Sequence, residues 1–301
     1  MRDVKIETTL DEREGIISRH PCLSEAAHGA YTRVHMPVAP KCNIQCRYCE
    51  RKFDCANESR PGVTSRVLGP LEAYERVLTL AERNPSLSVV GIAGPGDPLA
   101  NDETFTFLHL MKRGAPDLLA CVSTNGFMLQ ERAEDLASHG VASLTVTINA
   151  ITAETAGRIY AFTLKDRRRQ TGPDAMAELV ERQWGGLMRA VKTGMVVKVN
   201  TVYVPGVNDH EIPMIAARLG MLGVELMNVM PLIPHAEFAG RERPSCGELD
   251  RMRAACEAHV PQMRHCKQCR ADAFGPIGSD GDMDLELVNA HIGQEYCESV
   301  L

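Results

Sequence analysis

The sequence predicts an α/β protein, a partial (β/α)6 barrel with a ligand-carrying extension at each end. Two observations predict this fold class. Between about residues 31 and 235, short apolar runs rich in β-branched residues alternate with segments of helical periodicity. Polar and glycine-rich residues follow several of these runs, and α/β folds carry their sites at the carboxyl ends of parallel strands.

The repeat contains six expected strands and five expected helices. The expected strands are 31–39, 87–93, 118–124, 143–149, 195–204 and 225–230. The expected helices are 70–83, 102–113, 129–139, 174–192 and 210–222. Gly140 is expected just past the end of one helix, and Asp209 at the start of another. Such alternation implies parallel strands joined by right-handed crossovers.

We expect three regions: an N-terminal extension (1–30), the barrel (31–235) and a C-terminal extension (236–301). Both extensions carry ligand-type residues, namely His20, Cys22, Cys266 and Cys269. We therefore expect the extensions to be flaps that close over the barrel mouth. The basic run 165–170 is expected to be a solvated loop, with a partner-docking patch as the alternative.

Composition excludes several classes of protein. The 301 residues are 44% hydrophobic and carry a net charge of −6, which favours a globular fold and argues against a nucleic-acid partner. No apolar run is long enough to span a membrane, and the charged N-terminus lacks a signal-peptide core, so a cytoplasmic protein is expected. In a reducing compartment, disulfides among the eleven cysteines are not expected, and the clustered cysteines are better explained as metal ligands. Isolated cysteines such as Cys256, within an expected helix, are better explained as buried apolar residues.

Cys42, Cys46 and Cys49 form a C-x3-C-x2-C loop directly after the first expected strand. Three thiolates on one short loop can hold three corners of an iron–sulfur cubane and leave one iron open. A structural zinc site normally has four protein ligands, so the spacing favours an iron–sulfur cluster. Tyr48 either covers a planar ligand or simply packs.

Further polar residues follow the second, third and fourth expected strands. Gly94 and Gly96 would allow a ligand to approach the backbone closely, although a plain turn is the alternative. The remaining candidates are Asp97, Ser123, Thr124, Asn125 and Asn149.

The cysteine loop resembles that of the radical S-adenosylmethionine (SAM) superfamily, whose members share a partial barrel. The resemblance implies that SAM is chelated by the open iron and cleaved to a 5′-deoxyadenosyl radical. It also implies that the segment 94–98 contacts the SAM amino group. Ser123, Thr124, Asn125 and Asn149 become candidates for contacts with its ribose and carboxylate.

A narrower resemblance is carried by residues 20–65 and 268–280, which are similar to the NifB family of nitrogenase cofactor-maturation proteins. This resemblance implies a radical SAM enzyme of lyase or methyltransferase type with three 4Fe-4S clusters. Two of them are fused with a SAM-derived carbide and an added sulfide into an 8Fe-9S-C precursor, NifB-co. The implied partners are cluster donors, a reductant such as ferredoxin, and a carrier or scaffold that accepts the product. Because the sequence ends at Leu301, we expect the short form of the family, which lacks a C-terminal carrier-type domain.

Six further ligands remain for the two substrate clusters. We hypothesise that one cluster is held by His20, Cys55 and Cys121, and the other by Cys22, Cys266 and Cys269. The alternatives are a redox or zinc CxxC pair for Cys266 and Cys269, buried thiols, and a structural turn at His20. Glu58 and Arg60 are candidates for proton relay, with a capping or salt-bridge role equally open. Three cysteines match no motif: Cys246, Cys256 and Cys297.

Two other functions stay open. A radical SAM enzyme of another type could use the additional clusters for electron transfer, but such clusters would more often have four cysteine ligands. A non-enzymatic iron–sulfur scaffold would not need the SAM-type loop.

Overall fold

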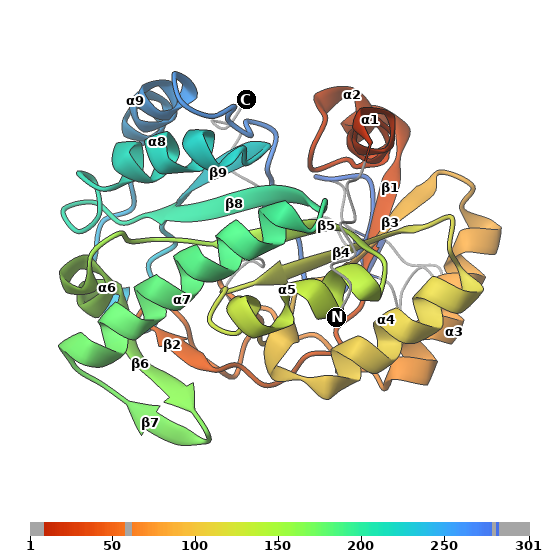
Figure 1. Ribbon diagram of the computed structural model, residues 1–301, viewed down its shortest axis with the longest axis horizontal. Helices are drawn as coiled ribbons and strands as arrows, with labels where there is room; N and C mark the ends of the chain where they lie inside the picture. The colour runs from red at the N-terminus through yellow and green to blue at the C-terminus, as the bar shows by residue number, and fades with distance from the viewer. Residues whose placement is uncertain (1–8, 58–61, 279–280, 283–301) are drawn as a thin grey trace.

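The computed structural model describes residues 9–57, 62–278 and 281–282. The larger sheet is curled and has the strand order β11-β10-β1-β3-β4-β5-β8-β9, in which the six neighbouring strands from β1 to β9 are parallel. These are β1 (Thr32–His35), β3 (Leu87–Ile92), β4 (Leu119–Thr124), β5 (Val141–Thr147), β8 (Val196–Tyr203) and β9 (Leu226–Pro231). Each overlaps one expected strand, so the predicted six-stranded partial barrel is confirmed (Figure 1).

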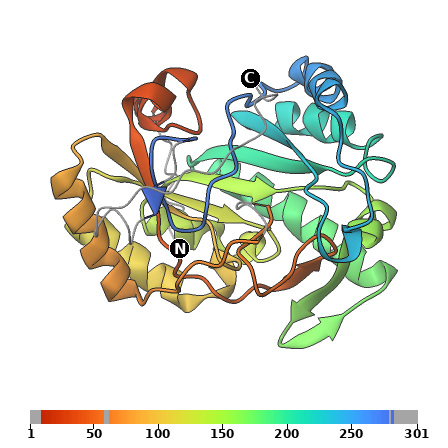
Figure 2. The ribbon, with the colours of Figure 1, turned by 180° about the vertical axis from the view of Figure 1, so that it is seen from behind.

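The five expected helices are also present, and they cover the outer face of the sheet (Figures 1 and 2). Their bounds are α3 (Pro70–Arg83), α4 (Asp102–Gly114), α5 (Leu129–Ser138), α7 (Pro173–Lys192) and α8 (Ile212–Leu222). Ala73, Val77 and Leu80 of α3 are buried, which is the spacing of one helix face against the sheet.

The two expected helix boundaries have different outcomes. Gly140 lies just past α5 with a φ of +82°, so its prediction is confirmed. The prediction that Asp209 caps a helix is wrong, because α8 begins only at Ile212, after Glu211. The Asp209 carboxylate instead accepts a hydrogen bond from the Tyr203 hydroxyl at 3.1 Å.

Of the remaining elements, only a helix around Cys256 was expected from the sequence, and α9 (Cys246–Glu257) confirms it. The other helices are α1 (Leu10–Arg19), α2 (Glu25–Ala30), α6 (Ala153–Ile159) and the 3-10 turns η1 (Pro98–Ala100) and η2 (Ala236–Phe238). The strands are β2 (Ile44–Cys46), β6 (Tyr160–Lys165), β7 (Arg168–Gln170), β10 (Ala273–Gly275) and β11 (Gly281–Asp282). The expected loop 165–170 is wrong for most of its length, since only Asp166 and Arg167 form a turn between β6 and β7.

The inner face of the curled sheet is polar. Strand pairing places His35, Gly91, Cys121 and Ser143 side by side across four strands. A Cβ on Gly91 would lie 2.7 Å from the His35 ring, so this glycine makes room for the imidazole. The hydrophobic core lies on the other face of the sheet, between the sheet and the outer helices. The polar side chains of the inner face are therefore not part of the core.

The N-terminal extension lies at the amino ends of the strands. The Ser88 hydroxyl, at the start of β3, donates to the carbonyl of Arg19 at 2.7 Å, and Arg13 forms an ion pair with Glu225 just before β9. Ile16 and Ile17 pack with Val196 and Leu226, which begin β8 and β9. The expectation of a flap over the barrel mouth is therefore wrong for α1, which lies at the opposite, amino-terminal opening.

The C-terminal extension joins the two edges of the parallel strands. The amide of Met263 donates to Met227 of β9, and β10 pairs antiparallel with β1. Between them, the His265 ring lies 3.1 Å from the carbonyl of Pro21. Both extensions therefore meet at the open side of the half barrel. No helix among the described residues is long and apolar enough to cross a membrane.

Candidate active site

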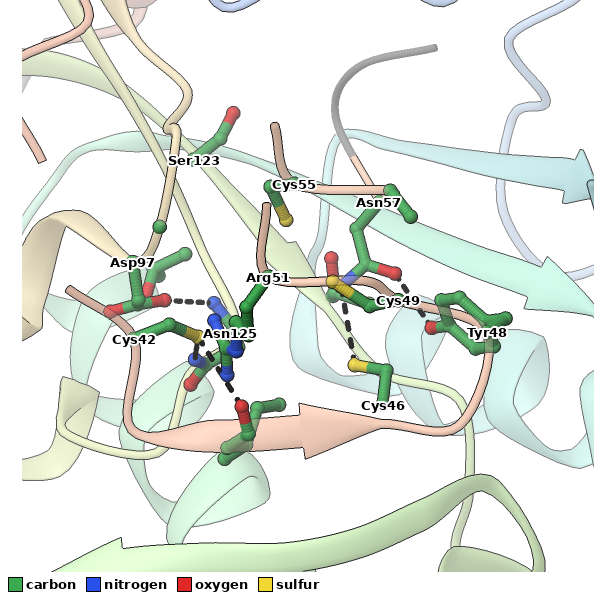
Figure 3. Close-up of a pocket in the computed structure, with 15 residues that line it drawn as sticks. Cys42, Cys46, Tyr48, Cys49, Arg51, Cys55, Asn57, Asp97, Ser123 and Asn125 are labelled. Atoms are coloured by element: carbon green, nitrogen blue, oxygen red, sulfur yellow. Dashed lines mark hydrogen bonds between the residues drawn. The ribbon is translucent and has the colours of Figure 1, made fainter. Parts of the chain in front are cut away.

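Cys42, Cys46 and Cys49 line one pocket at the carboxyl ends of the strands (Figure 3). The short strand β2 carries Cys46, and a turn brings the amide of Cys49 within 3.1 Å of the carbonyl of Cys46. The Gln45 side chain donates to the carbonyls of Cys46 and Cys49 at 2.9 and 2.7 Å. The loop is therefore shaped by its own residues.

Hydrogen-bond donors surround these sulfur atoms. The Asn125 amide lies 3.5 Å from the sulfur of Cys42, and the Asn57 amide lies 4.0 Å from that of Cys46. The Arg51 guanidinium lines the same pocket. Burial opposes its charge, but the neighbouring cysteine thiolates, Cys42 first, outweigh this and raise the pKa of Arg51. Donors and a cation suit thiolate ligands that carry negative charge.

The donor set fits an iron–sulfur cluster better than a lone ion. Among the described residues, no three His, Cys, Asp or Glu side chains converge as a site for one metal ion. A cubane needs no such convergence, because each thiolate binds a different corner. Burial raises the pKa of the Cys46 and Cys49 thiols, so a metal must displace their protons.

The segment 94–98 lies against the cysteine loop. A Cβ on Gly96 would lie 2.2 Å from the carbonyl oxygen of Lys41, so only glycine allows this approach. Two backbone hydrogen bonds join the loops, from the Gly96 amide to Ala39 at 2.5 Å and from the Asp97 amide to Lys41 at 2.8 Å. Gly94 has a φ of +140°, and a Cβ there would lie 3.8 Å from that of Cys55.

Asp97 joins two strand ends. Its carboxylate accepts hydrogen bonds from the Leu99 amide (3.0 Å), the Thr124 hydroxyl (2.9 Å) and the Asn125 amide (2.6 Å). Burial raises its pKa, although these three donors act in the opposite direction. Asp97 and Thr124 therefore hold the pocket wall, while Ser123 and Asn125 lie beside them on the pocket (Figure 3).

Tyr48 and Asn149 form a buried network behind the cysteines. The Tyr48 hydroxyl donates to Asn57 at 2.6 Å, and the Asn149 amide donates to the hydroxyls of Tyr48 and Tyr160 at 2.8 and 3.0 Å. The Asn149 oxygen accepts from the Val202 amide at 2.8 Å. Tyr48 lines the pocket but Asn149 does not, so the network supports the loop from behind.

A second group of thiols lies toward the amino ends of the strands. Cys22 interacts electrostatically with Cys121, Cys269, Lys198 and Arg33. The Arg33 guanidinium, which is fully buried, donates to the sulfur of Cys269 at 2.9 Å. Burial raises the pKa of Cys22 to about 12, with Lys198 and Arg33 acting against it. Three thiols thus face two buried cations inside the half barrel.

His20 belongs to the same group. Its Nδ1 accepts from the Cys22 amide at 3.1 Å, and its buried Nε2 has no hydrogen-bond partner in the described part of the chain. Burial, Lys198 and His35 lower its pKa to about 3, so the imidazole is neutral. A neutral imidazole with a spare nitrogen suits a metal ligand.

The other expected ligands lie on either side of this group. Cys55 lines the pocket of the first three cysteines, and Cys266 packs with Cys22 on a small apolar cluster. Proximity thus groups Cys121 with Cys22 and Cys269, whereas the hypothesised partition put it with His20 and Cys55. Glu58 and Arg60 lie outside the described residues.

Arg33, Arg51 and Lys198 were not recognised from the sequence. The only signal for Arg33 and Lys198 was a basic residue inside an apolar strand, in "TRVH" and "VVKVN". Cys256 is fully buried in α9, as expected for an apolar thiol, and Cys246 is exposed at the start of the same helix.

Residues 36–219 match the radical SAM superfamily, and the chain belongs to it. A radical SAM methyltransferase from Sphaerobacter thermophilus has a similar fold, with a TM-score of 0.54 at 21% identity over 77% of this chain and 64% of that one.

Within the superfamily, the similarity is to the radical SAM region of NifB proteins. The chain is 46% identical over 268 residues to the FeMo cofactor biosynthesis protein NifB of Klebsiella pneumoniae, covering 87% of this chain and 57% of that protein. It is 45% identical over 281 residues to NifB of Azotobacter vinelandii, covering 90% and 55%. The chain spans about half the length of the curated relatives it matches.

Proposed function

We propose that this chain is a nitrogenase cofactor maturase that fuses two 4Fe-4S clusters, a SAM-derived carbide and one added inorganic sulfide into an 8Fe-9S-C precursor. The observation that carries the proposal is the presence of two adjoining ligand groups in one half barrel. Cys42, Cys46 and Cys49 lie at the carboxyl ends of the strands, and the Cys22, Cys121 and Cys269 group lies further inside. A radical source and the cluster that it modifies would thus share one half barrel.

The first group would hold the SAM-cleaving cluster. This 4Fe-4S cluster, with SAM on its open iron, would supply the electron that cleaves SAM to methionine and a 5′-deoxyadenosyl radical. Asn125 and Arg51 would stabilise the thiolate ligands, and Gly96 would keep the loop after β3 against the cysteines. Ser123 faces the same pocket and is available to a ligand hydroxyl or carboxylate.

The second group would bind the substrate clusters. Clusters held by thiolates are anionic, and Arg33 and Lys198 would balance that charge in a buried place. His20 is neutral, so it would bind iron more weakly than a thiolate does. A replaceable ligand suits a cluster that must leave as product.

Cys55 would connect the two groups. It lines the SAM-type pocket and lies beside Gly94, where an added Cβ would also lie 3.4 Å from that of Ala271 in the C-terminal extension. Cys55 would therefore present a substrate cluster to the radical. One SAM would transfer its methyl group to a cluster sulfide, and the radical from a second would take hydrogen from that methyl group.

The proposed partners follow from this chemistry. Cluster donors, a reductant such as ferredoxin, and a carrier or scaffold that accepts the product would all be required. Clusters with open sites are sensitive to oxygen, so the reducing cytoplasm is the proposed location.

The products of SAM cleavage test the proposal. Reconstituted protein is incubated anaerobically with dithionite and SAM, and small products are measured. Both S-adenosylhomocysteine and 5′-deoxyadenosine are expected, because one SAM gives up a methyl group and another gives the radical. Deoxyadenosine alone would favour the alternative, a radical SAM enzyme with electron-transfer clusters. No cleavage at all would indicate a scaffold.

A further inference from the structure

The β6–β7 hairpin projects from the body of the protein beside α7 (Figures 1 and 2). Its turn residues Asp166 and Arg167 have φ values of +51° and +61°. Two-residue turns of this kind favour Asn-Gly, and an arginine in the left-handed region costs conformational free energy. An arginine at this tip is therefore explained better by its charge than by the turn.

The hairpin presents unneutralised positive charge. Arg167, Arg168 and Arg169 are all exposed. The Lys165 ammonium is paired with Glu178 at 2.6 Å, and the Arg169 guanidinium lies 4.2 Å from the centre of the Phe162 ring. Within the described ranges, Arg167 and Arg168 make no ion pair. Two guanidinium groups therefore remain for a partner.

The hairpin is hydrogen-bonded to the strand of the cysteine loop. In the sheet β2-β6-β7, Ile44 pairs with Thr163 and Cys46 with Tyr160. The Leu164 amide donates to the carbonyl of Asn43 at 2.6 Å. The antiparallel register brings the tip of the hairpin toward the end of β2 where Cys42 lies. Since β7 is the second strand from β2, the two strands are about 10 Å apart. Figure 3 shows β2 running beneath Cys42 and Cys46.

We propose that the β6–β7 hairpin is the docking surface for a small acidic one-electron carrier. This inference rests on the proposed function, which requires one electron from outside for each SAM that is cleaved. The carrier would be oxidised by one electron, and the cluster held by Cys42, Cys46 and Cys49 would be reduced by one.

Electrostatics favours this site for such a carrier. The chain has a net charge of −6, so most of its surface field repels an acidic protein. The hairpin is a local exception close to the cluster ligands. Opposite charges at a docking surface mainly raise the association rate, and salt weakens that effect.

The experiment compares two reductants on reconstituted protein. The test variant is Arg167→Glu/Arg168→Glu. The control is Arg83→Glu/Arg113→Glu, which makes the same charge change at exposed ends of α3 and α4, on the other side of the barrel (Figure 1). Each protein cleaves SAM with dithionite and, separately, with reduced flavodoxin, which is a small acidic one-electron donor.

We expect the test variant to keep its dithionite-driven rate and to lose about tenfold or more of its flavodoxin-driven rate at low salt. The difference should shrink as salt is raised, and the control should keep both rates. Equal losses of flavodoxin-driven rate in the test and control variants, or no loss in the test variant, would overturn the proposal that the hairpin is the docking surface. Tighter binding of duplex DNA than of flavodoxin at the hairpin would also overturn it. If the unaltered protein fails to cleave SAM with dithionite, the proposed function fails instead, and the inference fails with it.

Discussion

Gly96→Ala should separate the loop after β3 from the cysteine loop. Its new Cβ would lie 2.2 Å from the Lys41 carbonyl oxygen and 2.8 Å from that of Pro40, and both are backbone atoms that cannot rotate away. One of the loops must therefore shift by about 1 Å. That shift would break the two backbone hydrogen bonds between the loops, which contribute about 0.5–1.5 kcal/mol each to stability. Overpacking would destabilise the folded state by about another 1–3 kcal/mol. We expect a total loss of about 2–6 kcal/mol.

The assay is urea unfolding of the cluster-free protein, with iron retention after reconstitution as a second measurement. Gly15→Ala is the matched control, because nothing lies within 4 Å of its Cβ position and it is inside α1. That change should be neutral or stabilise the protein by up to about 1 kcal/mol. If Gly96→Ala unfolds at the same urea concentration as Gly15→Ala and retains its iron, the close approach of the two loops has no energetic importance.

Four further predictions concern other buried groups. His20→Gln should flatten the dependence of stability on pH. The pKa of His20 is about 3 in the folded protein against 6.5 in the unfolded chain, so the unfolded chain binds the proton first as pH falls. In the unaltered protein this should lower the free energy of unfolding between pH 6.5 and pH 3 by up to about 5 kcal/mol, which pH-dependent unfolding measures. Asp97→Asn should lower the free energy of unfolding in urea at pH 7 by about 2–4 kcal/mol, because an amide has only one oxygen to accept hydrogen bonds from the three donors. The control Asp102→Asn, on the exposed start of α4, should change the free energy of unfolding by less than about 0.5 kcal/mol. Lys198→Met should lower the amount of iron retained after reconstitution, because a cation beside the cluster thiolates is lost. The cluster-free protein should not become easier to unfold, because the substitution removes a buried charge. An unchanged iron content would contradict the role of Lys198 beside the thiols. Cys256→Ala should cost about 1–2 kcal/mol in thermal unfolding and leave the iron content unchanged, while Cys246→Ala should change neither.

The parallel strands could be predicted because most of them read as apolar runs, as in LSVVGI of β3 and VVKVNTVY of β8. The strands that were missed, such as β2 and β10, have three residues each, and their partners lie far away in the sequence. Such short pairings depend on tertiary contacts that no local pattern reports.

The cysteine loop could likewise be predicted, because its spacing is local. The inner group could not be fully derived, since Cys22, Cys121 and Cys269 are brought together only by the fold. The prediction that the N-terminal extension covers the barrel mouth was also wrong. Ligand-type residues indicate that a segment reaches a site, but they do not indicate from which end of the barrel it does so.

The most direct test of the central claim follows hydrogen from one SAM molecule to another. Reconstituted protein is incubated with dithionite and SAM that carries a deuterated methyl group, and the 5′-deoxyadenosine is analysed by mass spectrometry. If a methyl group placed on a substrate cluster is the target of the radical, deuterium must appear in the deoxyadenosine. It should be absent in Cys22→Ala/Cys121→Ala/Cys269→Ala, which retains the first cysteine loop. Deoxyadenosine without deuterium from the unaltered protein would contradict the claim that radical source and substrate cluster share this half barrel.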